Sequence, residues 1–185
     1  MILDKLLQFS SGQDLGQVAG TYTSTNIVDI GIGLQTTANP SGLAIPGVAA
    51  GGGARDLGIG DGLKLLVQVI EAFTSGGAAT LQVVLQGAVD NGAGAPAAFS
   101  SWWSSPVYAL ATLNAGSRLL DIDMPRPPDG IAMPRYLQLS YIIGTATTTA
   151  GTVDAYVLGD RDDQIYNATD NSILGGYPAG ITVAN

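Results

Sequence analysis

The sequence predicts an all-β protein, an antiparallel β-sandwich of the jelly-roll type with an extended N-terminal arm and long glycine-rich loops. Short segments in which apolar and polar residues alternate are typical of strands that bury one face. Many of the 26 glycines stand between these segments, where turns are expected. Only 12% of the residues are charged and there is a single glutamate, so surface positions lack the residues that favour helices.

Residues 1–20 are predicted to form the N-terminal arm. Their apolar cluster is too short to hold as an isolated helix and runs into Ser10-Ser11-Gly12, so we expect it to dock on a partner. Deleting the arm is expected to leave the rest of the protein folded. The candidate interface residues of the arm are Ile2, Leu3, Leu6, Leu7 and Phe9.

Residues 21–185 are predicted to form the sandwich domain, beginning with a β-rich segment at 21–30. Residues 31–62 form a long glycine-rich loop, and a loop of that length is uncommon in a compact domain unless it is functional or an extended arm. Its run Gly58-Ile59-Gly60-Asp61-Gly62 lacks the spacing and the lysine–serine pair of a phosphate-binding loop, which favours a flexible strand entry.

Strong alternation follows this loop. The strands expected after it lie at residues 63–73, 81–85, 107–113, 117–123, 137–143 and 153–157. The first two are predicted to form a hairpin around Ser75-Gly76-Gly77, and the next two a second pair around Asn114-Ala115-Gly116. Residues 159–185 are rich in turn-forming residues and are predicted to wrap around the domain.

The chain contains neither cysteine nor histidine. A disulfide framework, a serine–histidine–aspartate triad and the usual zinc-bound water are therefore excluded. We expect no catalytic, cofactor-binding or metal-binding residues, and the protein is not predicted to be an enzyme. Asp121 and Asp123 share a strand face, which keeps a carboxylate glycosidase open as a minor alternative. The turn Asp160-Arg161-Asp162-Asp163 could hold calcium, but its spacing differs from an EF-hand loop and a solvated turn is favoured.

The charge balance is acidic, with 15 acidic residues against 7 basic ones and a net charge of −8. Nucleic-acid binding relies on lysine and arginine clustered at phosphates, and the arginines here are scattered, so no direct contact with nucleic acid is expected. No stretch approaches the ~20 apolar residues of a membrane span, and the first residues lack the apolar core of a signal peptide. We therefore expect no membrane partner.

Trp102 and Trp103 are adjacent in the sequence. If this stretch is extended, the two side chains point to opposite faces, so one enters the core and the other is covered by a loop or by a partner. Tryptophan is frequent at interface hot spots, and both interpretations stay open. Apolar residues on the nominal outer faces of the strands, at Leu66, Ile70 and Val84, indicate that a second surface is covered.

Seven segments carry a resemblance to a known family through their order along the chain. They are Ile2-Leu3-Asp4-Lys5, Phe9-Ser10 with Gln13, residues 24–31, Asp56-Leu57-Gly58, Gly60-Asp61-Gly62 with residues 63–73, Ala132-Met133-Pro134-Arg135-Tyr136-Leu137, and Tyr177-Pro178-Ala179-Gly180-Ile181. In this order they resemble the cement, or decoration, proteins of certain short-tailed double-stranded DNA phages. No single segment is diagnostic.

The resemblance implies a jelly-roll domain that forms homo-oligomers on the outer capsid surface and bridges neighbouring capsomers of an HK97-like shell. We therefore predict a structural cement protein, without cofactors, whose partners are the major capsid protein and further copies of itself as a homodimer or homotrimer. Its expected location is the virion, after assembly in the host cytoplasm. The alternative is a β-sandwich carbohydrate-binding module on a virion surface, which rests on fold-level analogy.

Overall fold

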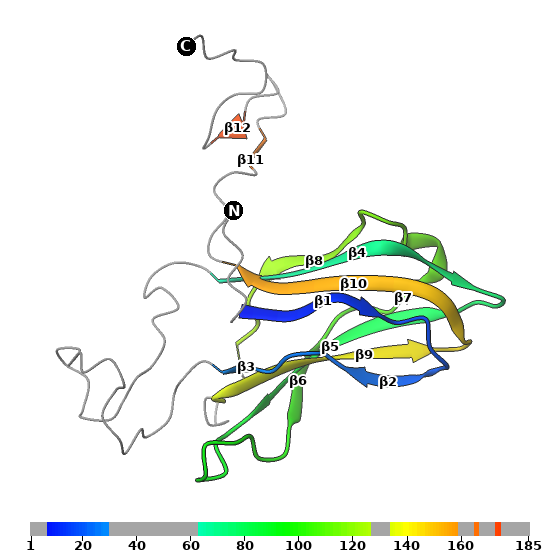
Figure 1. Cartoon of the computed structure of the whole chain (residues 1–185). Helices are drawn as coiled ribbons and strands as arrows, with labels where there is room; N and C mark the ends of the chain where they lie inside the picture. Colours follow the sequence, from blue (N-terminus) through cyan, green and yellow to red (C-terminus); the bar gives the residue numbers. More distant parts are fainter. Residues whose placement is uncertain (1–6, 30–62, 127–133, 159–164, 167–172, 175–185) are drawn as a thin grey trace.

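The computed structural model describes residues 7–29, 63–126, 134–158, 165–166 and 173–174, and two antiparallel sheets dominate them (Figure 1). The first sheet contains, in order, β1 (Gln8–Asp14), β10 (Thr148–Leu158), β4 (Lys64–Ser75) and β8 (Arg118–Asp123). The second contains β2 (Gly20–Thr23), β9 (Tyr136–Gly144), β5 (Thr80–Ala88) and β6 (Ser100–Ser104), with β3 (Val28–Asp29) paired to β9 and β7 (Tyr108–Ala109) paired to β5. A short 3-10 helix, η2 (Leu110–Thr112), follows β7, and β11 (Ile165–Tyr166) pairs with β12 (Ile173–Leu174). The predicted all-β sandwich is confirmed.

The core lies between the two sheets and is built from alternate residues of the long strands. Residues at every second position are buried because successive side chains of a strand point to opposite faces. The fully buried members from the central strands include Leu65, Val67 and Val69 of β4, Leu81, Val83 and Leu85 of β5, and Leu139 and Tyr141 of β9. Each buried aliphatic side chain stabilises the fold by about 1.5–3 kcal/mol.

The two predicted hairpins are wrong. β4 and β5 belong to opposite sheets: Ser75 of β4 pairs with Thr148 of β10, whereas Thr80 of β5 pairs with Gly144 of β9. The turn through Gly76 and Gly77 thus carries the chain across the core rather than back along the same sheet. Likewise β7 pairs with β5 and β8 pairs with β4, so the segments at 107–113 and 117–123 also lie in different sheets.

The predicted arm is shorter than residues 1–20. β1 pairs with β10 along the edge of the first sheet, and Phe9 and Leu15 are fully buried in the core. Backbone bonds from Asn26 to Phe9 and from Leu15 to Gly151 join this segment to both sheets. Phe9 and Leu15 therefore stabilise the sandwich itself, and of the predicted arm residues 1–6 lie outside the described region.

The three apolar residues predicted on outer faces do face away from the core: Leu66, Ile70 and Val84. Their neighbours along each strand are core residues, and successive side chains of a strand point to opposite faces. Their exposure differs: Leu66 and Val84 are 4% and 7% exposed, whereas Ile70 is 47% exposed. Two of the three outward apolar side chains are thus already covered within this chain.

Several predictions concern residues outside the described part of the structure. These are the loop at 31–62 with its glycine run, most of the segment at 159–185, and the turn Asp160-Arg161-Asp162-Asp163. Among the described residues, no helix has the length and apolarity needed to cross a membrane. Within the same residues, no group of three or more acidic, cysteine or histidine side chains could hold a metal ion.

Candidate functional site

The candidate interface residues lie in two places. Of the arm residues, Ile2, Leu3 and Leu6 are outside the described part of the chain. Leu7 is half-buried against the core, and Phe9 is fully buried within it. Phe9 therefore offers no side-chain surface to a partner.

Trp102 and Trp103 both pack against the core, and both are half-buried. The pairing of β5 with β6 explains how adjacent side chains do so: Leu85 pairs with Trp103 and Gln86 with Ser101, so Trp102 is the extra residue of a β-bulge. Its ring lies over Gly87, where an added Cβ would collide with the indole. The strict alternation assumed from the sequence fails at this bulge.

The indole Nε1 of Trp102 is buried and has no hydrogen-bond partner among the residues that the structure describes. Both rings pack on the core, so these two residues contribute to the sandwich itself.

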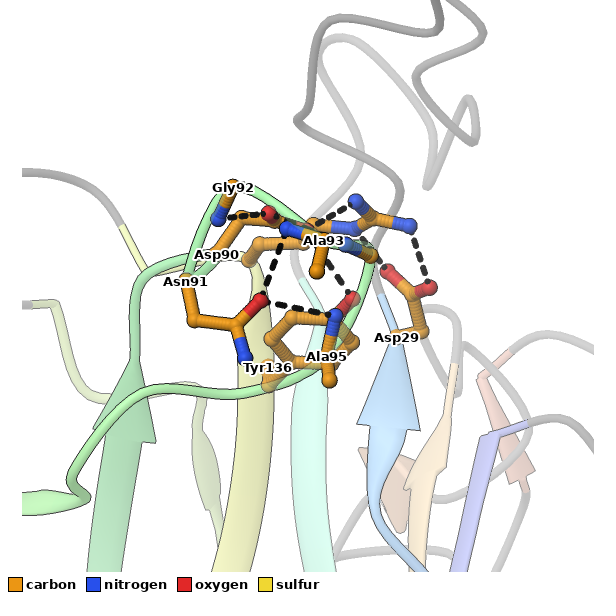
Figure 2. A network of polar contacts seen from close by, with 9 residues as sticks. Asp29, Asp90, Asn91, Gly92, Ala93, Ala95 and Tyr136 are labelled. Atoms are coloured by element: carbon orange, nitrogen blue, oxygen red, sulfur yellow. Dashed lines mark hydrogen bonds and ion pairs between the residues drawn. The ribbon is translucent and has the colours of Figure 1, made fainter.

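A polar network that the sequence did not predict is centred on Arg135 at the start of β9 (Figure 2). Its guanidinium donates from Nε and Nη2 to the two carboxylate oxygens of Asp29, both at 3.0 Å. Nη1 donates to Oδ2 of Asp90 at 2.5 Å, and the hydroxyl of Tyr136 donates to the same oxygen at 3.2 Å. The guanidinium also stacks 4.8 Å from the centre of the Tyr136 ring, a cation–π arrangement.

The second carboxylate oxygen of Asp90 folds the loop that follows β5. It accepts backbone N–H bonds from Gly92 at 2.6 Å and from Gly94 at 3.2 Å, and Gly92 has a φ of +88° that favours glycine. The side-chain oxygen of Asn91 accepts from Ala93 and Ala95 in the same way. Asp90 therefore connects Arg135 to a loop, residues 90–95, that is held by its own hydrogen bonds.

These contacts set the electrostatics of the network. Burial raises the pKa of the Asp90 carboxyl, but the N–H groups of Gly92 and Gly94, the Tyr136 hydroxyl and the Arg135 charge outweigh it, so the pKa lies below its ordinary value. The hydrogen bond to Asp29 raises the pKa of Arg135 further. The Asp90 carboxylate is therefore held in its charged form by these donors, which suits a structural role rather than proton transfer.

The network ties three chain segments together at one end of the sandwich. Asp29 ends β3, Asp90 follows β5, and Arg135 precedes β9, so the guanidinium links segments far apart in the sequence. Residues 30–62 follow directly after Asp29, and residues 127–133 end just before Pro134. The tie thus holds the ends of β3 and β9 at which both undescribed segments join the sandwich.

The sequence signals for this network were incomplete. The turn after Asp90 is marked by Asp90-Asn91-Gly92, a common turn combination. Arg135 stood out only within the segment that carries the family resemblance. Nothing in the spacing of Asp29, Asp90 and Arg135 indicates that they meet, because the sheet pairing that brings them together is non-local.

Asp121 and Asp123, the carboxylate pair considered for glycoside hydrolysis, lie on the edge strand β8 and are both exposed. Arg118 approaches Asp121 at 3.4 Å. The two side chains share the outer face of the first sheet, as their spacing predicts.

The protein is an antiparallel β-sandwich in which a network of ion pairs and hydrogen bonds around Arg135 holds three chain segments together. A family model described as Bbp16 matches residues 9–157, and the chain belongs to this phage-associated family. The match begins in β1 and ends in β10, so it spans both sheets. No curated protein matches the chain.

Proposed function

We propose that this protein is a structural cement protein, which binds the outer surface of a phage capsid and bridges neighbouring major capsid protein subunits. The observation that carries the proposal is the match to a phage-associated family over the whole sandwich. The ordered resemblance of short segments to phage cement proteins supports it. In this proposal the protein resides in the virion, after assembly in the host cytoplasm.

The strand order supports assignment of the sandwich as a jelly roll. The sheet β1-β10-β4-β8 faces the sheet β2-β9-β5-β6, and successive long strands cross repeatedly from one sheet to the other. A jelly roll consists of two such four-stranded sheets formed by two Greek keys. In this arrangement the two longest strands, β4 and β10, lie at the centre of the first sheet. Their backbone groups are therefore not free to pair with other chains, as those of an edge strand are.

The physical task of a cement protein is to resist separation of capsomers. A contact of standard size buries about 1,600 Å² in total, and many such contacts on one lattice gain from effective concentration. The Arg135 network supports this task because it fixes the sandwich where the segment 30–62 begins and where the segment 127–133 ends. In this proposal Ile2, Leu3 and Leu6 contact the capsid.

Binding to heads that lack this protein tests the proposal. Purified protein is added to expanded heads, and co-sedimentation and the temperature of head disruption are measured. We expect saturation at a fixed ratio to the major capsid protein and a higher disruption temperature. An absence of co-sedimentation at saturating protein, or demonstrated turnover of a substrate, would overturn it.

A set of substitutions in the first six residues tests the predicted contact. Ile2, Leu3 and Leu6 are changed to serine in one variant, and the matched control changes Asp4 and Lys5 of the same segment. We expect the first variant to bind heads at least about tenfold more weakly, because each of its substitutions removes apolar surface that the contact would bury. The control should bind nearly as the native chain does. Equal binding of both variants would remove these residues from the interface.

A further inference from the structure

The loop that follows β5 contains an asparagine directly before a glycine, at Asn91 and Gly92. Both residues are exposed, as are the three residues that follow them. The backbone nitrogen of the residue after an asparagine can attack the side-chain amide, and this reaction converts the amide to a carboxylate. Glycine in that next position has no Cβ to hinder the attack. The loop therefore presents a reactive amide where water reaches it.

The structure holds the Asn91 side chain in a defined position within this loop (Figure 2). Its carboxamide oxygen Oδ1 accepts the N–H of Ala93 at 2.8 Å and that of Ala95 at 3.4 Å. The ring closed by the first of these bonds contains the Gly92 peptide, so the carboxamide folds over the turn that contains the Gly92 nitrogen. The attacking group and the attacked group therefore belong to one ordered turn.

The same hydrogen bonds favour the attack electrostatically. When a nitrogen adds to Cγ of the amide, negative charge develops on the carboxamide oxygen. N–H groups that already point at this oxygen stabilise the charge as it forms. The Ala93 N–H lies at the distance of a normal hydrogen bond, and the Ala95 N–H is a longer and weaker second donor.

One contact acts in the opposite direction. Oδ1 of Asp90 accepts the N–H of Gly92 at 2.6 Å, and a carboxylate in this position holds the proton that the nitrogen must lose. Asp90 is charged at neutral and alkaline pH, because its pKa lies below its ordinary value, so its effect is constant in this range. The proton therefore passes to hydroxide from the solvent, and the rate of the reaction rises with pH.

We propose that Asn91 is a site of covalent modification, at which the amide is converted to aspartate and isoaspartate through a cyclic imide. The Gly92 nitrogen forms a bond to Cγ of Asn91 and loses its proton to hydroxide. The bond between Cγ and Nδ2 breaks, and the nitrogen takes a proton from water and leaves as ammonia. Water then opens the imide at either carbonyl, which gives aspartate or its β-linked isomer. No atom is oxidised or reduced, and water is the co-reactant.

The modification changes the loop that Asp90 connects to Arg135. Either product has a carboxylate at position 91, which adds one negative charge to a chain whose net charge is −8. The isoaspartyl product also has an additional methylene in the main chain before Gly92. The bonds of Gly92 and Gly94 to Asp90 depend on the spacing of these residues, so the isomer should weaken them. This inference does not rest on the capsid function.

Timed incubation of the purified full-length chain at neutral and at mildly alkaline pH tests the inference. Mass spectrometry of digests follows the replacement of the amide by a hydroxyl, and a methyltransferase specific for isoaspartyl groups measures the isomer. Asn114 is the internal control: it is exposed and begins a turn, but Ala115 follows it, and its Nδ2 rather than its oxygen is bonded, to the carbonyl of Ala111. We expect conversion at Asn91 to be at least about tenfold faster than at Asn114 and to accelerate as the pH rises.

Two glycine substitutions separate the reaction from the conformation of the loop. Gly92→Ala and Gly94→Ala both place a Cβ where no atom lies within 4 Å, at φ values of +88° and +79°. They impose similar backbone strain, but only Gly92→Ala puts a methyl group beside the attacking nitrogen. We expect conversion at Asn91 to be at least about tenfold slower in Gly92→Ala than in Gly94→Ala. Circular dichroism and melting curves establish that both variants are folded.

Three results would overturn the inference. The first is equal conversion at Asn91 and Asn114 in the native chain. The second is an Asn91 that stays unreacted through incubation at the higher pH. The third is a pair of folded Gly92→Ala and Gly94→Ala variants that react at the same rate.

Discussion

Replacing Phe9 with alanine tests whether β1 is part of the folded frame or a detachable arm. The Phe9 side chain is fully buried, and Asn26 donates a backbone bond of 2.9 Å to its carbonyl oxygen. A buried phenylalanine removes at least about 150 Å² from water, which at about 25 cal/mol per Å² contributes about 4 kcal/mol. Alanine keeps part of that area, whereas the cavity adds a further penalty, so the expected loss is about 3–5 kcal/mol.

Urea unfolding followed by tryptophan fluorescence and circular dichroism measures this loss. The control is Val18→Ala, which changes a residue that is 63% exposed and should alter the free energy of unfolding by less than about 0.5 kcal/mol. By the same argument, deletion of residues 1–20 should prevent stable folding, because it removes β1 and Leu15. If Phe9→Ala costs less than about 1 kcal/mol, β1 is not part of the core and the shorter arm inferred here is wrong.

Three further outcomes are expected. Because the pKa of Asp90 is lowered on folding, its charged form stabilises the fold above the unfolded value of 3.8. In urea titrations the difference in unfolding free energy between the native chain and Asp90→Asn should be constant near neutral pH and shrink as the pH falls below that value. Burial raises the pKa of Tyr141 above its ordinary value of 10.0, so stability is lost as the pH rises past 10. Tyr141→Phe should make this alkaline loss of stability shallower, and an unchanged slope would contradict the role given to Tyr141. Gly87→Ala would drive a Cβ into the indole of Trp102, so we expect a loss of about 1–3 kcal/mol and a shifted tryptophan emission spectrum, and native emission would show that the ring is not packed there.

The strands themselves could be predicted, because alternation reports directly which side of a strand is buried. Leu137, Leu139, Tyr141 and Ile143 alternate along residues 137–143, and all four are buried on β9. The same signal placed the strand that became β10. Alternation is a local property, so it survives whatever the strand pairs with.

Strand pairing could not be predicted in the same way. The turn at Ser75-Gly76-Gly77 looks like a hairpin turn, yet it links strands in opposite sheets. A strand buries its apolar face in either sheet of a sandwich. Periodicity therefore does not show whether two successive strands pair within one sheet or lie in opposite sheets. The contact between this turn and the β9–β10 turn, where an added Cβ on Gly77 would lie 3.1 Å from that of Ala146, is visible only in three dimensions.

The polar features of the protein show the same division between local and non-local information. The uncharged segments 15–28, 72–89, 91–117 and 136–153 can be read from the sequence, where they look like ordinary low-charge stretches. Only the strand order shows that they supply most of the second sheet, whose strands carry a single charged residue, Asp29. In the same way Asp29, Asp90 and Arg135 are isolated charges between such segments, and the sheet pairing brings them to one end of the sandwich. On the strands of the second sheet the one charged residue, Asp29, is therefore part of this network.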